Sequence, residues 1–177
     1  MKESNKLFNI FIRYFIILIA AFLVFYSNLF YSIFLVLTIY PVGWLLSLSF
    51  NTQILFDLLV VNGISISLIS ACVAISAYFL LFILNLGTSM SSLKRIYSLI
   101  FSFVLLLLFN ILRIFVLSIL YVTGNPNLEI IHKTLWYSLN IIVVISIWFV
   151  SVYLFKIKKI PFYDDFRAIF KLKNYFK

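Results

Sequence analysis

The sequence predicts an all-α integral membrane protein with four firm transmembrane helices, an outer-face segment and a short β-hairpin. Hydrophobic residues make up 65% of the 177-residue chain and charged residues 11%, whereas soluble domains have about 45–50% apolar and about 25% charged residues. Four apolar runs approach or exceed the roughly 20 residues that a membrane-spanning helix needs. Basic residues flank these runs on one side, as is typical of cytoplasmic loops.

The four predicted spans divide the chain into one membrane domain, residues 1–155, and a basic cytoplasmic tail, residues 156–177. The N-terminal run lacks a small-residue cleavage site, so we interpret it as an uncleaved first span rather than a signal peptide. The tail mixes aromatic residues with lysines, which predicts an interfacial helix starting near Asp164 or Asp165. The predicted spans are residues 8–26, 71–88, 96–120 and 134–155.

Residues 29–50 form a further apolar run, whose assignment depends on charge. Lys94, Arg95 and the lysine-rich tail are two spans apart and therefore share the cytoplasmic side. The N-terminal lysines lie on the cytoplasmic side as well only if residues 29–50 do not cross the membrane. Because Pro41 would kink or break a helix, we expect an interfacial or re-entrant segment at the outer face, within an outer segment 29–70. A fifth span is the alternative.

A β-hairpin is predicted at residues 56–69, on the outer side. Asn62 and Gly63 lie between two β-prone runs, and Asn-Gly is the preferred pair for a two-residue type I′ turn. The following "ISISLI" alternates apolar residues with serine, the period of a strand. The hairpin leads directly into Cys72.

The composition excludes several kinds of site. The single cysteine, Cys72, cannot form an intrachain disulfide or a cysteine cluster for zinc or iron–sulfur. The single histidine, His132, disfavours a histidine metal site, and the four glycines form no phosphate-binding loop. We therefore expect no cofactor and no metal. The net charge of +9 indicates membrane topology rather than nucleic-acid binding.

Arg113 is the most unusual charge of the sequence, because it lies within the leucine-rich run "LLLLFNILRIFVLSIL". A charge at mid-membrane costs about 2.5–3.5 kcal/mol on insertion scales. Arg113 is about 10 Å from the outer end of its predicted span, at about 1.5 Å per residue. Asn110, three residues earlier, shares its helix face. The pair implies a polar partner or a water-filled cavity; the alternative is a structural anchor that binds backbone carbonyls.

Cys72 and His132 each have an ordinary explanation when taken alone. Free cysteine behaves as a small hydrophobe, and the alanines around Cys72 fit close helix packing, with Ser76 one turn further on the same face. A lone histidine at a membrane interface is usually an amphipathic residue near headgroups. His132 heads the last predicted span, where Trp136 and Asn140 share its face.

Together, the three residues indicate a reactive site. The predicted topology places Cys72, Arg113 and His132 on three spans, all in the outer leaflet or at its mouth. Cysteine attacks as the thiolate, which a nearby cation stabilises, and histidine can deliver a proton to a leaving amine. A fixed guanidinium can stabilise a developing oxyanion. This combination predicts acyl transfer through a thioester.

The order and spacing of these residues resemble the exosortase/archaeosortase family. The resemblance rests on "ISACVAISAY", on "NILRI" in the next span and on the downstream histidine, covers about residues 55–150, and is strongest to the archaeal members. Where many bacterial members have a glycine soon after the cysteine, this chain has Val73 and Ala74.

The resemblance implies a membrane-embedded cysteine transpeptidase that acts on exported proteins. Their C-terminal sorting signal would comprise a short motif, a hydrophobic helix and a basic end. Cys72 would attack the scissile carbonyl on the outer side of the plasma membrane, with Arg113 and His132 assisting and Asn110, Ser76 and Asn140 in support. An acceptor would then resolve the thioester. The acceptor could be a membrane lipid, an amine or water. No nucleic-acid partner is expected.

A non-enzymatic alternative explains the same residues. In a small carrier or a membrane assembly subunit, Asn110 and Arg113 would line a path for a solute or a lipid headgroup, and Cys72 would only pack. The two hypotheses differ in whether the Cys72 thiol is reactive.

Overall fold

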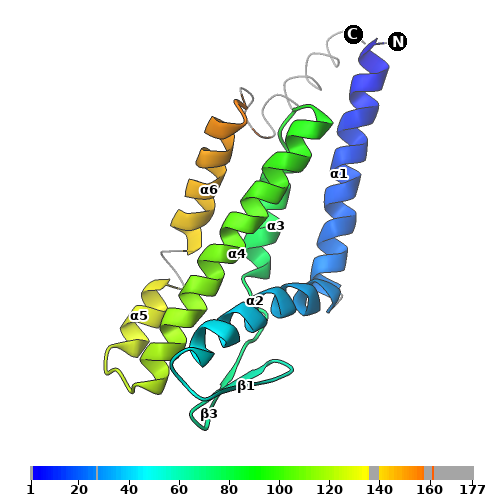
Figure 1. Cartoon of the computed structure of the whole chain (residues 1–177). Helices are drawn as coiled ribbons and strands as arrows, with labels where there is room; N and C mark the ends of the chain where they lie inside the picture. Colours follow the sequence, from blue (N-terminus) through cyan, green and yellow to red (C-terminus); the bar gives the residue numbers. More distant parts are fainter. Residues whose placement is uncertain (1, 27, 136–139, 158–160, 162–177) are drawn as a thin grey trace.

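The computed structural model describes residues 2–26, 28–135, 140–157 and 161 (Figure 1). In this part, six helices and one three-stranded sheet follow one another along the chain. The helices are α1 (Lys2–Tyr26), α2 (Leu29–Ser47), α3 (Ile75–Leu86), α4 (Ser92–Val122), α5 (Leu128–Thr134) and α6 (Asn140–Leu154). The strands, which lie between α2 and α3, are β1 (Thr52–Leu55), β2 (Leu58–Val61) and β3 (Ile64–Ser67).

Helix α4 is the centre of the fold and contacts α2, α3, α5 and α6. Its buried face repeats at every fourth residue, which places these side chains along one stripe of the helix. Polar residues occupy much of this stripe, although the rest of the helix is rich in leucine. The buried residues at this spacing are Ser98, Ser102, Leu106, Asn110, Ile114 and Ser118.

The predicted hairpin is confirmed. Strands β2 and β3 pair antiparallel, with Val61 opposite Ile64. Between them, Asn62 and Gly63 both have positive φ, 51° and 82°, as a type I′ turn requires. A third strand, β1, was not predicted; it pairs antiparallel with β2, and the sheet lies with α5 at the end of α4 that is far from Ser92 (Figure 1).

Helix α2 covers this sheet at very short range. A Cβ atom on Gly43 would lie 2.6 Å from Cδ1 of Ile54 in β1 and 3.4 Å from Cδ1 of Leu59 in β2. Only a glycine allows this approach without displacing a neighbour. Figure 1 also shows that the chain turns sharply after α1, so that α2 packs across α4.

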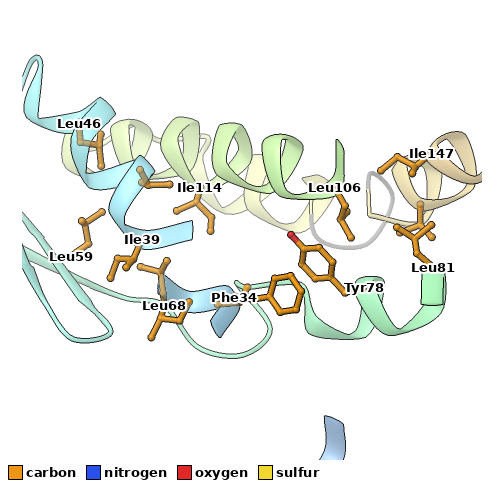
Figure 2. Close-up of a cluster of buried hydrophobic side chains, with 14 of the residues drawn as sticks. Phe34, Ile39, Leu46, Leu59, Leu68, Tyr78, Leu81, Leu106, Ile114 and Ile147 are labelled. Atoms are coloured by element: carbon orange, nitrogen blue, oxygen red, sulfur yellow. The ribbon is translucent and has the colours of Figure 1, made fainter. Parts of the chain in front are cut away.

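An aromatic cluster joins α2, α3 and α4 in the hydrophobic core. The rings of Phe34 and Tyr78 stack with centroids 4.0 Å apart, and Phe103 meets Tyr78 edge-on at 5.3 Å. Figure 2 shows the first two rings facing each other beside Leu106. Leu59 of the sheet is fully buried in the same cluster.

Buried polar contacts fasten the helices at the other end. Asn85 of α3 donates a 2.8 Å hydrogen bond from Nδ2 to Oγ of Ser98 in α4. That hydroxyl lies 2.6 Å from Oγ of Ser151 in α6. Arg13 of α1 is buried and donates to the carbonyl oxygen of Leu86 at 3.4 Å.

The prediction of four transmembrane helices is wrong. In the described part of the chain, only α2 and α4 are long and apolar enough to cross a membrane. Helix α3 has 12 residues and α6 has 15, so at about 1.5 Å per residue both are shorter than a hydrocarbon core of about 30 Å. In α1, the apolar stretch covers 17 residues, Phe8–Val24.

Helix α3 is short because residues 70–74 form a turn instead of the first helical turns. Ala74 has φ 60° and ψ 34°, the left-handed conformation, which ends the turn and starts the helix at Ile75. Residues 70–74 contain neither proline nor glycine, so the sequence carries no signal for this turn.

The predicted break at Pro41 is also wrong. Helix α2 continues through Pro41 from Leu29 to Ser47, and it is one of the two helices that could cross a membrane. Proline removes a single backbone donor, and here the packing of α2 on α4 and the sheet holds the helix together. The predicted tail helix near Asp164 and Asp165 lies outside the described residues.

Candidate functional site

Cys72 lies in the turn between β3 and α3 rather than on a helix. Its backbone nitrogen donates to the carbonyl oxygen of Ile69 at 2.8 Å, and Val73 donates to the same oxygen at 3.2 Å. The left-handed Ala74 completes the turn and is itself buried. Cys72 is a free, half-buried cysteine. The turn therefore holds the only thiol of the chain where it stays accessible.

Arg113 binds this turn directly. The side chain is buried in α4, and Nη2 donates a 2.9 Å hydrogen bond to the carbonyl oxygen of Cys72. The guanidinium also lies within electrostatic range of the Cys72 thiol. Arg113 therefore binds a backbone carbonyl, as the structural-anchor alternative expects, and the residue it binds is the one that bears the thiol. A buried guanidinium retains its charge, so it supplies a fixed cation beside the backbone of Cys72.

His132 reaches the same place from the short helix α5. Its side chain is exposed, and Leu128, one turn earlier on α5, lines the site with it. The neighbouring Lys133 pairs with Glu129 at 2.6 Å, an i,i+4 pair that supports the short helix.

Cys72, Arg113 and His132 line one cavity of about 350 Å³. They come from the turn before α3, from α4 and from α5, so the fold brings together residues separated by up to 60 positions. The other walls are mainly apolar, with hydroxyl groups from β3 and α4. The remaining lining residues are Ser65, Ile66, Ser67, Leu68, Ile114, Leu117, Ser118, Tyr121 and Leu128.

The predicted supporting residues have different positions. Asn110 is buried one turn before Arg113 but does not line the cavity. Within the described part of the chain, neither its Oδ1 nor its Nδ2 has a hydrogen-bond partner. Ser76 is exposed on α3 and does not line the cavity. The Asn140 side chain and Trp136 lie outside the described residues.

Tyr31 was missed by sequence reasoning. It belongs to α2, and its hydroxyl donates a 2.7 Å hydrogen bond to the carbonyl oxygen of Leu68, which lies between β3 and the Cys72 turn. The phenol lies within electrostatic range of Cys72 and Asp57. A tyrosine in an apolar run produces no sequence signal for such a contact, because the contact depends on α2 folding back over the sheet.

The geometry suits nucleophilic chemistry at the sulfur. A thiol, a fixed cation and an imidazole share a small, mostly apolar space, and electrostatic interactions are stronger in such surroundings than in water. Among the described residues, no group of three or more His, Cys, Asp or Glu side chains could hold a metal ion.

The class of site is therefore a cysteine-centred cavity at one end of a helical bundle. Comparisons with protein-family models, curated proteins and solved structures return no match to this chain. A function for the cavity has to be argued from its own residues.

Proposed function

We propose that this protein is a membrane-embedded cysteine transpeptidase, similar in chemistry to the exosortase/archaeosortase family that its motifs resemble. One observation carries the proposal: the only cysteine, the buried Arg113 and the only histidine line a single cavity. A packing cysteine has no need of either neighbour, whereas a cysteine nucleophile works best with both.

Charge and helix length support an outer location for the cavity. Lys94 precedes Arg113 by 19 residues on α4, which is about 28 Å at about 1.5 Å per residue and close to the hydrocarbon thickness of about 30 Å. Lys94 and Lys156 line a common cavity at the end of α4 near Ser92. Basic residues favour the cytoplasmic side. In the proposed orientation, within a multi-pass plasma-membrane protein, the Cys72 cavity faces outward and the C-terminus is cytoplasmic.

The proposed reaction begins when the Cys72 sulfur attacks the scissile carbonyl carbon of a sorting signal. Arg113 stabilises the thiolate and the oxyanion that develops, and it fixes the turn that presents the sulfur. His132 gives a proton to the departing amine as the carbon–nitrogen bond breaks and the thioester forms. An acceptor nucleophile then displaces the sulfur, which leaves as the thiolate, and His132 takes back a proton from the acceptor. The acceptor is a lipid, an amine or water.

The decisive experiment co-expresses the protein with an exported substrate that carries a short motif, a hydrophobic helix and a basic end. Cys72→Ala should insert normally and leave the substrate unprocessed on a gel. Cys72→Ser should fail as well, because a serine hydroxyl is a far weaker nucleophile without a strong base. Trapping the substrate on Cys72 and weighing the adduct would identify the thioester. Full processing by Cys72→Ala would overturn the proposal.

The second candidate, a non-enzymatic carrier or assembly subunit, is favoured by the bond between Arg113 and the Cys72 carbonyl, because a structural anchor makes such a bond. Labelling intact cells with a membrane-impermeant thiol reagent separates the two functions. Rapid modification of Cys72 supports the transpeptidase, and an inert thiol supports the carrier.

A further inference from the structure

A second and larger cavity lies at the opposite end of the bundle from the Cys72 cavity. Its volume is about 910 Å³. Its walls are formed by residues 9–16 of α1, the loop after α3, the start of α4 and the residues that follow α6. The proposed transpeptidase chemistry uses none of these residues.

This cavity is strongly basic. Arg13, Lys94, Arg95 and Lys156 all line it, and none of the described lining residues is acidic. The four cations come from three parts of the chain that are distant in sequence, so their meeting is a product of the fold. Concentrating like charges is unfavourable unless an anion is present.

Two of the cations are held in place. Arg13 is nine-tenths buried, and Nη1 lies 3.4 Å from both the carbonyl oxygen of Leu86 and Oγ of Ser89. Arg95 donates from Nη2 to the carbonyl oxygen of Thr88 at 3.1 Å. The loop after α3 is thereby bound from both sides, by α1 and by α4, which gives the cavity a fixed wall.

Lys156 occupies a position where glycine is usual. It has φ 50°, and Ile157 donates to the carbonyl oxygen of Val152 at 3.0 Å, the bond of a Schellman helix end. A lysine in the left-handed conformation is strained relative to glycine. Lysine at this position therefore costs backbone energy that glycine would not. Such strain is expected where the side chain has a role in binding.

The rest of the lining indicates which anion fits. Ile10, Ile12 and Ile16 of α1 form an apolar wall beside the cations, together with Leu86 and Met90. A soluble anion such as free phosphate makes no favourable contact with an apolar wall. A phospholipid places its phosphate against cations and its glycerol and first methylenes against apolar side chains. Ser91 and Ser92 at the start of α4 also line the cavity, and backbone donors at a helix start favour anions.

We propose that this cavity binds the phosphate headgroup of an anionic phospholipid from the cytoplasmic leaflet. Lys94, Arg95 and Lys156 contact the phosphate, and Arg13 fixes the wall behind it. The site would anchor α1, α4 and α6 at the membrane surface. Basic pockets between helices on the cytoplasmic side of membrane proteins are suited to such headgroups.

The test uses the purified full-length protein in detergent and counts bound lipid by native mass spectrometry. Dioctanoyl phosphatidylglycerol should bind, and dioctanoyl phosphatidylcholine should bind far less. Lys94→Gln should weaken phosphatidylglycerol binding about fivefold, since one basic residue near a membrane surface contributes on the order of one kilocalorie. Lys133→Gln, which removes an exposed lysine at the other end of the molecule, should leave binding unchanged.

Lys156→Gly separates binding from folding. This change relieves the left-handed strain, so the thermal midpoint without lipid should stay the same or rise while phosphatidylglycerol binding falls about fivefold. Equal binding of the two lipids, or equal losses in Lys94→Gln and Lys133→Gln, would overturn the proposal. Displacement of phosphatidylglycerol by inorganic phosphate at equal concentration would also overturn it, because the site would then be selective for free phosphate.

Discussion

Nη2 of Arg113 donates a 2.9 Å hydrogen bond to the carbonyl oxygen of Cys72. This bond joins the middle of α4 to the turn that precedes α3, across 41 positions of sequence. Because the carbonyl belongs to Cys72 itself, the position of the thiol depends on the arginine. The same side chain can therefore determine both the shape of the site and its charge.

Arg113→Lys should lower substrate processing on the order of 100-fold, the loss expected when one fixed donor is removed from an acyl-transfer site. A lysine keeps the positive charge, but a single ammonium cannot hold the Cys72 carbonyl and face the thiol with the planar geometry of a guanidinium. The measurement is the processed fraction of the co-expressed substrate on a gel, normalised to the amount of variant in the membrane. Processing at the wild-type rate would show that charge alone suffices.

Ala74 is the second residue that shapes the turn, and its left-handed conformation makes a matched pair of variants informative. Ala74→Gly should change the thermal midpoint little, because relief of about 1–2 kcal/mol of strain is offset by lost methyl burial and a more flexible unfolded chain. Ala74→Val should destabilise by more than about 2 kcal/mol, since a β-branched residue tolerates neither this φ nor the buried position. A stable Ala74→Val protein would contradict the observed turn.

Local signals in the sequence predicted the parts of the fold that depend on local chemistry. Asn62 and Gly63 are enough to define the hairpin turn, and a lone arginine among leucines is enough to indicate a polar contact. The short α3 was not predictable, because the turn before it is bound at the Cys72 carbonyl by Arg113, a residue far away in sequence. The intact α2 was missed for a similar reason: tertiary packing overrides the local effect of Pro41.

The sequence drew attention to three residues that line the cavity, but it gave no sign of the residues around them. Cys72, Arg113 and His132 stand out because each is rare in its context, and the cavity brings them together. Tyr31 is one of 11 tyrosines, and only the folded path of α2 distinguishes it. Their catalytic roles are predictions that the variants above test.

Gly43 tests the contact between α2 and the sheet. Gly43→Ala should lower stability by about 1–3 kcal/mol, the usual cost of overpacking, because the new Cβ would meet Cδ1 of Ile54 at 2.6 Å. Ile54→Val removes that Cδ1 atom, so the double variant should be more stable than Gly43→Ala alone. Thermal unfolding in detergent measures both. Equal midpoints for Gly43→Ala and the double variant would mean that Cδ1 of Ile54 is not the obstacle.

Two buried asparagines should respond in opposite directions to the same substitution. Asn110→Leu should raise stability by about 1–3 kcal/mol, because its amide atoms are buried without a hydrogen-bond partner among the described residues. Asn85→Leu should lower stability by a smaller amount, since it removes the 2.8 Å bond from Nδ2 to Ser98 but also an Oδ1 that is buried without a partner among the described residues. Both variants are compared with wild type by thermal unfolding, then by substrate processing. Loss of processing in a stabilised Asn110→Leu protein would identify Asn110 as a residue kept for function; a destabilised Asn110→Leu protein would mean that its amide has a partner after all.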